Sequence, residues 1–581
     1  MRSFVADFET TTNENDCRVW AWAVCDIENM DNITIGTDID SFMEWCASQP
    51  DNVKVYFHNM RFDSQFTMYW LFHNNFRHVN SKERESGTFT TIISNKGMYY
   101  AIEIIFKLKN KTVKKVTIWD SYKLLPMSVD KIAKSFDLPI GKLEIDYDAH
   151  NDLPVGSPIS PEEEEYIRHD VKIVAHALKY FFDQGLNRMT IGSCALHEYK
   201  NLIGKRLFNR YFPTLSPVCH KDIKQAYRGG YVYTNPKLIG KTVGNGIVLD
   251  INALYSYVMQ SKLLPWGTPI FFRGEYEYDD IYRLYVVKVR CAFDIKPGKL
   301  PTIQLKNSLF YTGNEYVTSS NDEEWTLFLT NVDLELFLEN YNVYNLEYIS
   351  GWKFRGARGL FKPYIDKWNG NKTKAREEGN AGLELISKLF LNSLSGKFGT
   401  DTTVKEKIPY LGDDDVVHFK DSEAEERDGI YIPMSAFITS YGRSIIVNAA
   451  QKITDDYNAG KSKLQYAYSD TDSLHILSED FSLPEGFNID KYELGAYKFE
   501  TKFRKGKFLR AKCYIEDSTK DVYNDDPEYK LKVTVAGMPD SCKDQVNFDN
   551  FKIGATYTGK KSPKAVRGGV VLETIDFTIK Q

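Results

Sequence analysis

Two adjacent glycines near the middle of the chain, Gly229 and Gly230, set the first constraint on its fold. They follow Tyr227 and Arg228 and interrupt a pattern of strand-like and helical segments, because glycine permits backbone conformations that other residues resist. We therefore predict a hinge between two halves at this point. The 581 residues also exceed what one hydrophobic core normally serves, so we expect roughly three to four compact units.

Composition limits the class of protein. Hydrophobic residues make up 42% and aromatic residues 14% of the chain, which is enough to bury large cores and excludes wholesale disorder. The formal net charge of −5 does not indicate binding by bulk cationic attraction. Basic stretches at 504–512 and 552–567 are compatible with local contacts to nucleic acid, although ordinary solvated surface explains each of them equally well.

The eight cysteines are scattered and include no Cys-x-x-Cys pair. We therefore predict neither a disulfide framework nor a thiolate zinc site. Residues 1–12 contain no apolar signal-peptide stretch, and no run of about eighteen apolar residues occurs. These features predict a soluble protein of a reducing compartment, the cytoplasm.

The start of the chain reads as a strand with acidic side chains on one face. Residues 4–9 alternate apolar and acidic positions, and Asp7 and Glu9, two positions apart, leave the same face of a strand. Both carboxylates could share a divalent cation, since hard ions such as Mg²⁺ prefer oxygen ligands. Asn59 and Asp63 follow in a second short polar segment.

A predicted helix supplies a third group. Ser160 is a suitable N-cap, Pro161 stands at the first helical position and acids follow, so we predict a helix that runs past Leu178. Tyr166 and Asp170 lie four residues apart on one face of it. Any one pair is more simply an ordinary surface strand or helix. The ordered set instead indicates two-metal phosphodiester hydrolysis, in which a tyrosine hydroxyl could orient the attacking water.

A second set of acids lies in the second half of the chain. Asp250 ends an apolar strand that begins at Gly246, where a bare carboxylate is unfavourable unless a metal or polar cleft receives it. Asp470 and Asp472 bracket Thr471 between two strand-like runs. A structural hairpin is the simpler interpretation of this Asp-Thr-Asp segment if it is taken alone.

Lysines accompany these acids. Lys388, Asn392 and Ser395 line one face of a helix predicted at 383–395. Lys372 lies on a preceding helix, and a turn at residues 379–382 would bring the two lysines together. They could then neutralise a triphosphate, whereas without the neighbouring acids a solvated helical face is the simpler interpretation.

The first set resembles the proofreading exonuclease of family B DNA polymerases, whose three motifs match residues 7–10, 59–63 and 166–170. The resemblance implies an RNase-H-like fold in which Asp7, Glu9, Asp63 and Asp170 bind metal. It further implies that Tyr166 is catalytic, that Lys142 helps hold the scissile phosphate and that Glu144 assists with metal. The residues implied to grip a single-stranded 3′ end are Thr10, Asn59, Phe62, Ser121 and Tyr147.

Nearly the whole chain resembles the protein-primed family B DNA polymerases of small tailed bacteriophages. The matching segments are 227–230, 250–255, 388–397, 439–443, 466–473 and 512–514. By this resemblance Asp250 and Asp472 hold two catalytic Mg²⁺ ions, for which Mn²⁺ could substitute, with help from the Ile251 carbonyl and from Asp470. Tyr255 would select deoxyribonucleotides, Lys372 and Lys388 would bind the triphosphate, and Asn392 would shape the base-pair pocket. The residues implied to face DNA are Tyr227, Gly229, Gly230, Thr439, Arg443, Lys512 and Tyr514.

The same resemblance implies a mixed α/β architecture, an RNase-H-like 3′–5′ exonuclease domain followed by a right-hand polymerase domain with two insertions. The implied parts are the exonuclease at 1–189, the palm at 190–261 and 431–535, a first insertion at 262–358, the fingers at 359–398, a second insertion at 399–430 and the thumb at 536–581. The insertions would contact a terminal protein, clamp DNA and allow strand displacement. We expect a monomer that replicates viral DNA in the cytoplasm of an infected bacterial host, using primer-template DNA, deoxynucleoside triphosphates and a terminal protein as primer.

Three positions depart from the family pattern. Ala253 and Ser256 stand where relatives carry serine and proline, and Ser395 replaces a tyrosine. We hypothesise that the missing ring at Ser395 loosens base or sugar discrimination. Two other interpretations remain open: a nuclease whose second half only binds nucleic acid, and a non-enzymatic scaffold.

Overall fold

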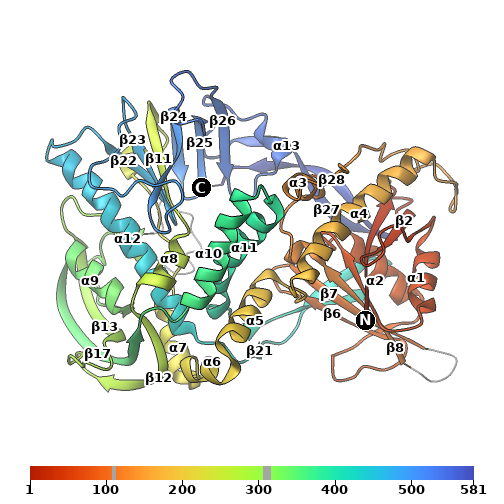
Figure 1. Cartoon of the computed structure of the whole chain (residues 1–581), viewed down its shortest axis with the longest axis horizontal. Coiled ribbons are helices and arrows are strands. Elements are labelled where there is room, and N and C mark those ends of the chain that lie inside the picture. The colour runs from red at the N-terminus through yellow and green to blue at the C-terminus, as the bar shows by residue number, and fades with distance from the viewer. Residues whose placement is uncertain (108–112, 305–315, 581) are drawn as a thin grey trace.

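A mixed β-sheet forms the middle of the N-terminal unit, at the right of Figure 1. The structure is a computed structural model that describes residues 1–107, 113–304 and 316–580. Strand β1 pairs antiparallel with β2 and parallel with β4, so it lies inside the sheet. In spatial order the strands are β3 (Ile33–Gly36), β2 (Val19–Asp26), β1 (Arg2–Thr10), β4 (Val53–Phe57), β8 (Val113–Asp120), β7 (Tyr99–Lys107), β6 (Thr88–Ile93) and β5 (Arg77–His78).

Helices cover this sheet, and the longest of them confirms the predicted capped helix. Ser160 accepts a hydrogen bond from the Glu163 backbone N–H, and the Glu163 carboxylate accepts one from the Ser160 N–H, which is a complete capping box. The predicted first strand is also confirmed. The helices of this unit are α1 (Ile39–Ser48), α2 (Asp63–His73), the 3-10 turn η1 (Ser121–Lys123), α3 (Val129–Ser135) and α4 (Pro161–Asp183).

A second sheet carries the acids of the second half and lies at the upper left of Figure 1. Its central strand β11 is flanked by β23 and β24. The predicted strands on both sides of the Asp-Thr-Asp segment are confirmed as β22 and β23, which pair with each other. The strands run in the order β26 (Lys530–Val535), β25 (Cys513–Thr519), β24 (Tyr497–Arg510), β11 (Gly246–Ile251), β23 (Ser473–Leu477), β22 (Gln465–Asp470) and β9 (Val232–Thr234), and β10 (Thr242–Val243) pairs with β24. The short helices η2 (Pro236–Leu238) and α8 (Leu254–Ser261) follow β9 and β11.

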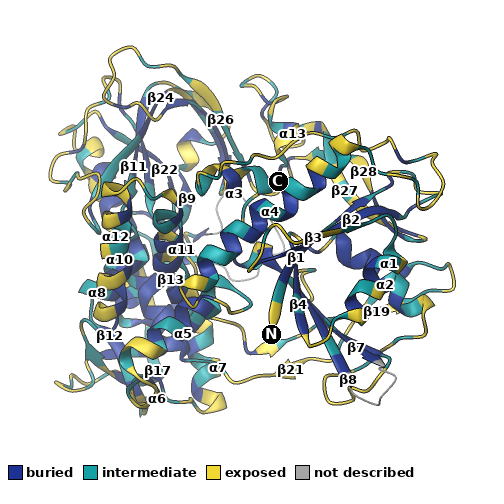
Figure 2. Ribbon diagram, turned by 45° about the vertical axis from the view of Figure 1, so that its right-hand side comes forward, coloured by how far each residue is buried: buried dark blue, intermediate teal, exposed yellow. Residues whose placement is uncertain are grey.

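One long helix, α12 (Ile432–Asn458), holds the second half together. It is buried over most of its length and contacts α7, α8, α9, α11, β12 and β22, as the dark ribbon in Figure 2 illustrates. A helix that is apolar on most sides must be enclosed by protein. Elements that lie far apart in the sequence therefore meet on α12.

The two predicted helices beside the lysines form an antiparallel pair, as expected. α10 (Lys362–Glu377) and α11 (Ala381–Phe398) are joined through Gly379, which has φ of 68°, and Asn380, whose side chain caps α11 at Leu383. The preceding helices are α5 (Ile191–Ile203), α6 (Lys205–Tyr211) and α7 (Pro217–Ala226), and α5 packs against α10 and α11.

The segment predicted as the first insertion folds into a separate small sheet with its own hydrophobic core, at the lower left of Figure 1. The segment also contains α9 (Asn331–Asn340), and residues 305–315 of it lie outside the described residues. The sheet order is β12 (Leu264–Arg273), β17 (Tyr341–Ala357), β13 (Leu284–Ile295) and β16 (Trp325–Thr330), beside a small pair of β14 (Ile303–Gln304) and β15 (Tyr316–Val317).

The segment predicted as the second insertion forms two nested hairpins that reach the N-terminal unit. Asp415, at the tip of β19–β20, accepts hydrogen bonds from Tyr69 and His73 of α2 and pairs with Arg567 at 2.7 Å. Arg567 lies at the turn of the C-terminal hairpin, so three distant segments meet here. The elements are β18 (Thr403–Val404), β19 (Lys407–Leu411), β20 (Val417–Asp421), β21 (Glu425–Glu426), α13 (Asp540–Lys543), β27 (Thr556–Val566) and β28 (Gly569–Thr578).

The loop of residues 227–230 joins α7 to β9, and the structure shows it anchored at its backbone. Arg443 donates to the carbonyl oxygens of Arg228 at 2.9 Å and of Gly229 at 2.7 Å. Gly230 packs against Thr471, leaving no room for a side chain. A hinge at this loop therefore stays a prediction.

The other side of Arg443 binds the first insertion. Its guanidinium pairs with the Asp333 carboxylate of α9 at 2.6 Å, and both side chains are largely buried. Because Arg443 belongs to α12, this ion pair ties the insertion to the centre of the second half. Within the described residues, no helix combines the length and apolarity needed to cross a membrane.

Replacing Asp333 by alanine should destabilise the protein. Arg443 would remain buried without its carboxylate, so we expect the free energy of unfolding to fall by about 3 kcal/mol. Glu335→Ala removes an exposed carboxylate from the same helix and should change it by less than about 0.5 kcal/mol. Urea unfolding measures both variants, and equal stability of the two would contradict the prediction.

Candidate active sites

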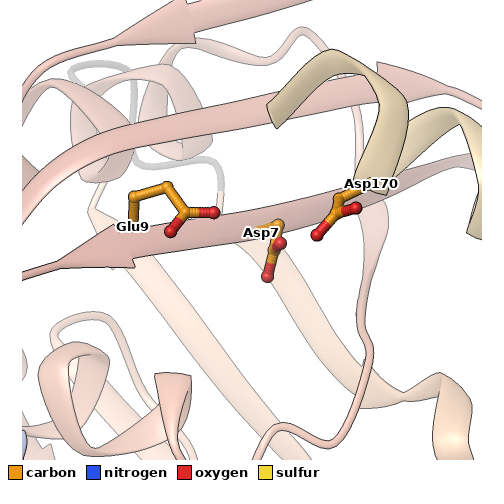
Figure 3. A group of neighbouring side chains, drawn as sticks. All are labelled: Asp7, Glu9 and Asp170. Carbon is orange, nitrogen blue, oxygen red and sulfur yellow. The ribbon is translucent and has the colours of Figure 1, made fainter. Parts of the chain in front are cut away.

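Three carboxylates of the N-terminal unit lie together. Asp7 and Glu9 leave the same face of β1, and Asp170 approaches from α4, as Figure 3 shows. One oxygen of each lies within 4.8 Å of an oxygen of the other two. Burial favours the protonated forms, and repulsion between the carboxylates adds to it, so the pKa of Asp7 is raised to about 7 and the pKa of Glu9 is also raised.

The donor set fits a divalent metal. Asp170 Oδ1 is buried and has no hydrogen-bond partner among the described residues, whereas Asp170 Oδ2 accepts a hydrogen bond from Lys142 Nζ at 2.6 Å. A buried carboxylate oxygen without a partner is costly unless a cation satisfies it. Oxygen atoms from three carboxylates are the ligands that Mg²⁺ and related ions prefer.

Two other predicted residues border this cluster. Asp63, the first residue of α2, is buried, and burial and the Asp7 charge raise its pKa. It lies next to the group of three but is not one of its members. Tyr166 is buried with its hydroxyl 3.1 Å from the hydroxyl of Tyr147, which is itself half-exposed. The predicted metal helper Glu144 is exposed in a loop, and the structure gives it no place in the carboxylate group.

A buried aspartate that the sequence interpretation missed holds the loop beside these acids. Asp120 Oδ1 accepts hydrogen bonds from the backbone N–H groups of Asn59 at 2.9 Å, Met60 at 3.4 Å and Tyr122 at 3.0 Å. Asn59 has φ of 67°, a left-handed conformation that needs such support. Asp120 thereby fixes the direction of the loop that leads into Asp63.

The remaining residues predicted to grip a 3′ end differ in exposure. Thr10 and Phe62 are partly exposed at the ends of β1 and of the loop before α2. Ser121 is fully buried, and its hydroxyl donates to the Phe57 carbonyl at 3.0 Å. Their contacts with DNA stay predictions.

A second pair of acids meets where strands inside the second sheet end. Asp250 is the last residue but one of β11, and Asp472 follows Thr471, whose φ of 64° turns the chain between β22 and β23. The Ile251 N–H donates to the Asp472 carbonyl at 2.8 Å, which fixes the turn against β11. Burial raises the pKa of Asp250 to about 7 and of Asp472 to about 6, and neighbouring acids contribute in both cases.

The third acid of this set is already paired. Asp470 accepts hydrogen bonds from Lys512 Nζ at 2.7 and 3.0 Å. The Lys512 backbone N–H also donates to the Tyr468 hydroxyl at 2.9 Å, and Tyr514 is buried beside that ring. The structure thus brings two predicted motifs together, with Asp470 neutralised by Lys512.

A hollow of about 620 Å³ lies in front of Asp250 and Asp472, between the sheet edge and the α10–α11 pair. The predicted residues Lys372, Lys388 and Asn392 line it from the helices. Lining residues that the sequence interpretation missed are Asn252, Arg376, Glu384, Leu391, Lys491, Tyr492, Lys498 and Glu500. Tyr255 is the second residue of α8 and packs against Gly442 of α12, near Asp472.

Two residues predicted to face DNA have structural contacts instead of open surfaces. Thr439 is buried, and its hydroxyl donates within α12 to the Ser435 carbonyl at 3.0 Å. Arg443 is 3% exposed and is engaged by Asp333 and the glycine loop. Tyr227 lies near the end of α11, where its hydroxyl contacts Gly399. Direct DNA contact by these residues stays a prediction.

Of the departures from the family pattern, Ser256 has a local explanation, whereas nothing in the structure explains Ala253. Ala253 adopts a left-handed conformation with φ of 47° before α8. The Ser256 hydroxyl donates to the Leu391 carbonyl at 2.8 Å, a bond between α8 and α11 that proline could not make. Ser395 is buried and is not among the residues that line the hollow, so its effect on discrimination stays a hypothesis.

Comparison with known proteins agrees with this geometry. A family described as "DNA polymerase type B, organellar and viral" matches residues 46–157 and 154–482. The chain belongs to this family. The DNA polymerases of Bacillus phage M2 and Bacillus phage phi29 are 44% and 42% identical to it, over 100% of this chain and 100% and 99% of theirs. The DNA polymerase of Streptococcus phage Cp-1 is 31% identical over 100% of this chain and 98% of its own.

Solved structures give the same result for this type B polymerase. Phi29 DNA polymerase complexed with primer-template DNA and incoming nucleotide matches with a TM-score of 0.92 and 42% identity over the whole of both chains. The same enzyme complexed with single-stranded DNA matches at 0.91 and 40%, also over both whole chains. The expected mixed α/β architecture, an exonuclease unit followed by palm, fingers and thumb, is therefore confirmed. The domain boundaries stay predictions.

The chain is thus a viral-type DNA polymerase, and 3′–5′ exonuclease activity is known for its family. DNA polymerases of this family use divalent metals. The resemblance to phage polymerases inferred from the motifs is confirmed at the level of the family.

The raised pKa of Asp7 predicts a pH-dependent stability. The pKa of this acid rises from about 4 in the unfolded chain to about 7 on folding. The shift leaves the free energy of unfolding unchanged below pH 4 and lowers it by the full amount above pH 7. In EDTA at pH 8, Asp7→Asn should therefore raise the free energy of unfolding by roughly 1–3 kcal/mol. Thermal unfolding at pH 8 and pH 4 measures this, and an equal gain at both values would contradict it. Mg²⁺ should shrink the gain at pH 8, because it stabilises only the wild-type site.

Proposed function

We propose that this polymerase adds deoxynucleotides at the Asp250–Asp472 site and removes them from a 3′ end at the Asp7–Glu9–Asp170 site. The separation of the two carboxylate centres on two different sheets supports this assignment most strongly. Each has the acids that divalent ions need and a lysine within reach of phosphate. The second opens into a hollow large enough for a nucleotide.

At the addition site, Asp250 and Asp472 would hold two Mg²⁺ ions with the Ile251 carbonyl. Bound there, the metal would supply charge stabilisation for attack of a primer hydroxyl on the α-phosphate. Lys372 and Lys388 would bind the triphosphate, and Asn392 would border the nascent base pair. Tyr255 would lie under the sugar, and its fixed position against Gly442 supports a role in excluding a 2′-hydroxyl.

At the removal site, Asp7, Glu9, Asp63 and Asp170 would hold divalent metal. Lys142, already hydrogen-bonded to Asp170, would hold the scissile phosphate. Tyr166, with its hydroxyl directed to Tyr147, would orient the attacking water. Thr10, Asn59 and Phe62 would grip the unpaired end of the primer, so that this site proofreads.

We further propose protein-primed initiation and strand displacement by a monomeric enzyme. The first insertion, with its own sheet and core, would contact a terminal protein whose hydroxyl serves as the first primer. The second insertion and the C-terminal hairpin, joined by Asp415 and Arg567, would enclose DNA. The test of initiation is incubation with a candidate terminal protein and labelled nucleotide in the absence of an oligonucleotide. We expect labelled nucleotide to become covalently linked to that protein.

Separate loss of the two activities is expected on removing each acid set. Asp472→Ala should lower the rate of extension of a primed template by a factor of about 10³ or more and leave 3′-end degradation unchanged. Asp7→Ala with Glu9→Ala should do the reverse. Both are measured on the same labelled primer-template. Unaltered extension by Asp472→Ala would contradict the assignment of the addition site and favour a nuclease with a structural second half.

Asp120 should act as a positioning residue for degradation. Asp120→Ala leaves the Asn59 loop without its shared acceptor, so we expect the DNA concentration for half-maximal degradation to rise by about tenfold. Extension should change by less than about twofold. Asp130→Ala, which removes an exposed acid from α3, is the control. An unchanged concentration for Asp120→Ala would contradict this role, and equal loss of extension would indicate misfolding.

A further inference from the structure

Four lysines line the nucleotide-sized hollow, and among the described residues none of them has a carboxylate partner within 4 Å. Of the cations that line it, Arg376 is paired with Glu384, and Lys491 lies over the Tyr492 ring. In the described part of the chain, Lys372, Lys388 and Lys498 have no ion pair within 4 Å. Unpaired ammonium groups that converge on one hollow indicate an anionic ligand.

Lys498 differs from the other two in its origin. Lys372 and Lys388 come from α10 and α11, whereas Lys498 belongs to β24 of the catalytic sheet. It is the cross-strand partner of Asp250, and residues directly opposite each other in an antiparallel pair share one face of the sheet. Lys498 therefore rises from the floor of the hollow beside the metal-binding acid.

The charge of Lys498 affects ionisable groups on both sides of the hollow. Burial, Asp472 and Glu500 raise the pKa of Asp250, and Lys498 opposes them. On the other wall, burial lowers the pKa of Lys372, and Lys498 adds to the effect of Arg376 and Lys388. Lys498 thus lies between the acid that would bind metal and the lysines that would bind phosphate.

We propose that Lys498 is a third cation for the triphosphate of the incoming nucleotide, contacting its β- and γ-phosphates from the palm. The inference rests on the proposed addition site and deepens it. Phosphate oxygens held by the fingers lysines would face Lys498 across the hollow, so the triphosphate would bridge the two walls. A lysine suits this position because it acts as a compact point charge with three donors.

A purely electrostatic role of Lys498 beside Asp250 predicts different binding effects. If Lys498 only moderated the charge of Asp250, its loss would change the affinity for metal and leave the affinity for nucleotide and pyrophosphate unchanged at saturating metal. Contact with the β- and γ-phosphates instead predicts weaker binding of both, because pyrophosphate retains those groups.

The test uses Lys498→Met, which keeps the length of the side chain and removes its charge. Extension of a primed template should need about tenfold more nucleotide for half-maximal rate, with kcat within about twofold. Pyrophosphate inhibition should weaken by a similar factor, and the Mg²⁺ concentration for half-maximal rate should not shift. Lys498→Arg should recover most of the loss, and Lys530→Met, at an exposed lysine of β26, is the matched control.

A binding measurement separates affinity from chemistry. On a primer ending in a dideoxynucleotide, which cannot be extended, Lys498→Met should need about tenfold more of the correct nucleotide to stabilise the enzyme–DNA complex. An unchanged nucleotide requirement, or a shift in Mg²⁺ requirement alone, would overturn the proposal. Failure of the wild type and of Lys530→Met to extend the primer would instead refute the addition site itself, and 3′-end degradation shows that each variant is folded.

Discussion

Burying several carboxylates close together is the main electrostatic cost that the two sheets of this molecule must offset. Asp7 and Glu9 project from a strand that is hydrogen-bonded on both sides, and Asp250 lies near the end of a strand flanked in the same way. A strand inside a sheet cannot shift to relieve the repulsion without breaking two ladders. The sheets therefore keep the acids close enough to share a cation, and the raised pKa values of these groups express the cost.

The two centres balance their negative charge differently. Lys142 contacts Asp170 directly, so the first centre is partly neutralised within itself. In the second, Lys372 and Lys388 stand across a hollow from Asp250 and Asp472 and make no ion pair with them among the described residues. Asp470 alone is neutralised, by Lys512. Opposite charges held apart in this way suit a substrate that brings both metal and phosphate between them.

Sequence patterns identified the acids well because strand alternation, helix spacing and capping are local properties. The capped helix with Tyr166 and Asp170, and the strand ending at Asp250, occur where predicted. The same signal, an acid that ends an apolar strand, was available for Asp120 and was missed. Lys498 gave no such signal, because its importance comes from the pairing of β24 with β11, a contact between residues far apart in the chain. Burial of Arg443 likewise depends on α9 of a separate segment, so a motif that matched the family gave no indication of its ion pair.

The bonds of Arg443 also link regions that the chain order separates. Asp333 of the small sheet holds Arg443, Arg443 holds the carbonyl oxygens before Gly230, and Gly230 lies against Thr471 in the catalytic turn. A protein that docks on the small sheet and displaces α9 must either break the ion pair or move this loop. Asp333, Arg443, the loop of residues 228–230 and Thr471 therefore form one continuous series of contacts from α9 to the Asp-Thr-Asp turn.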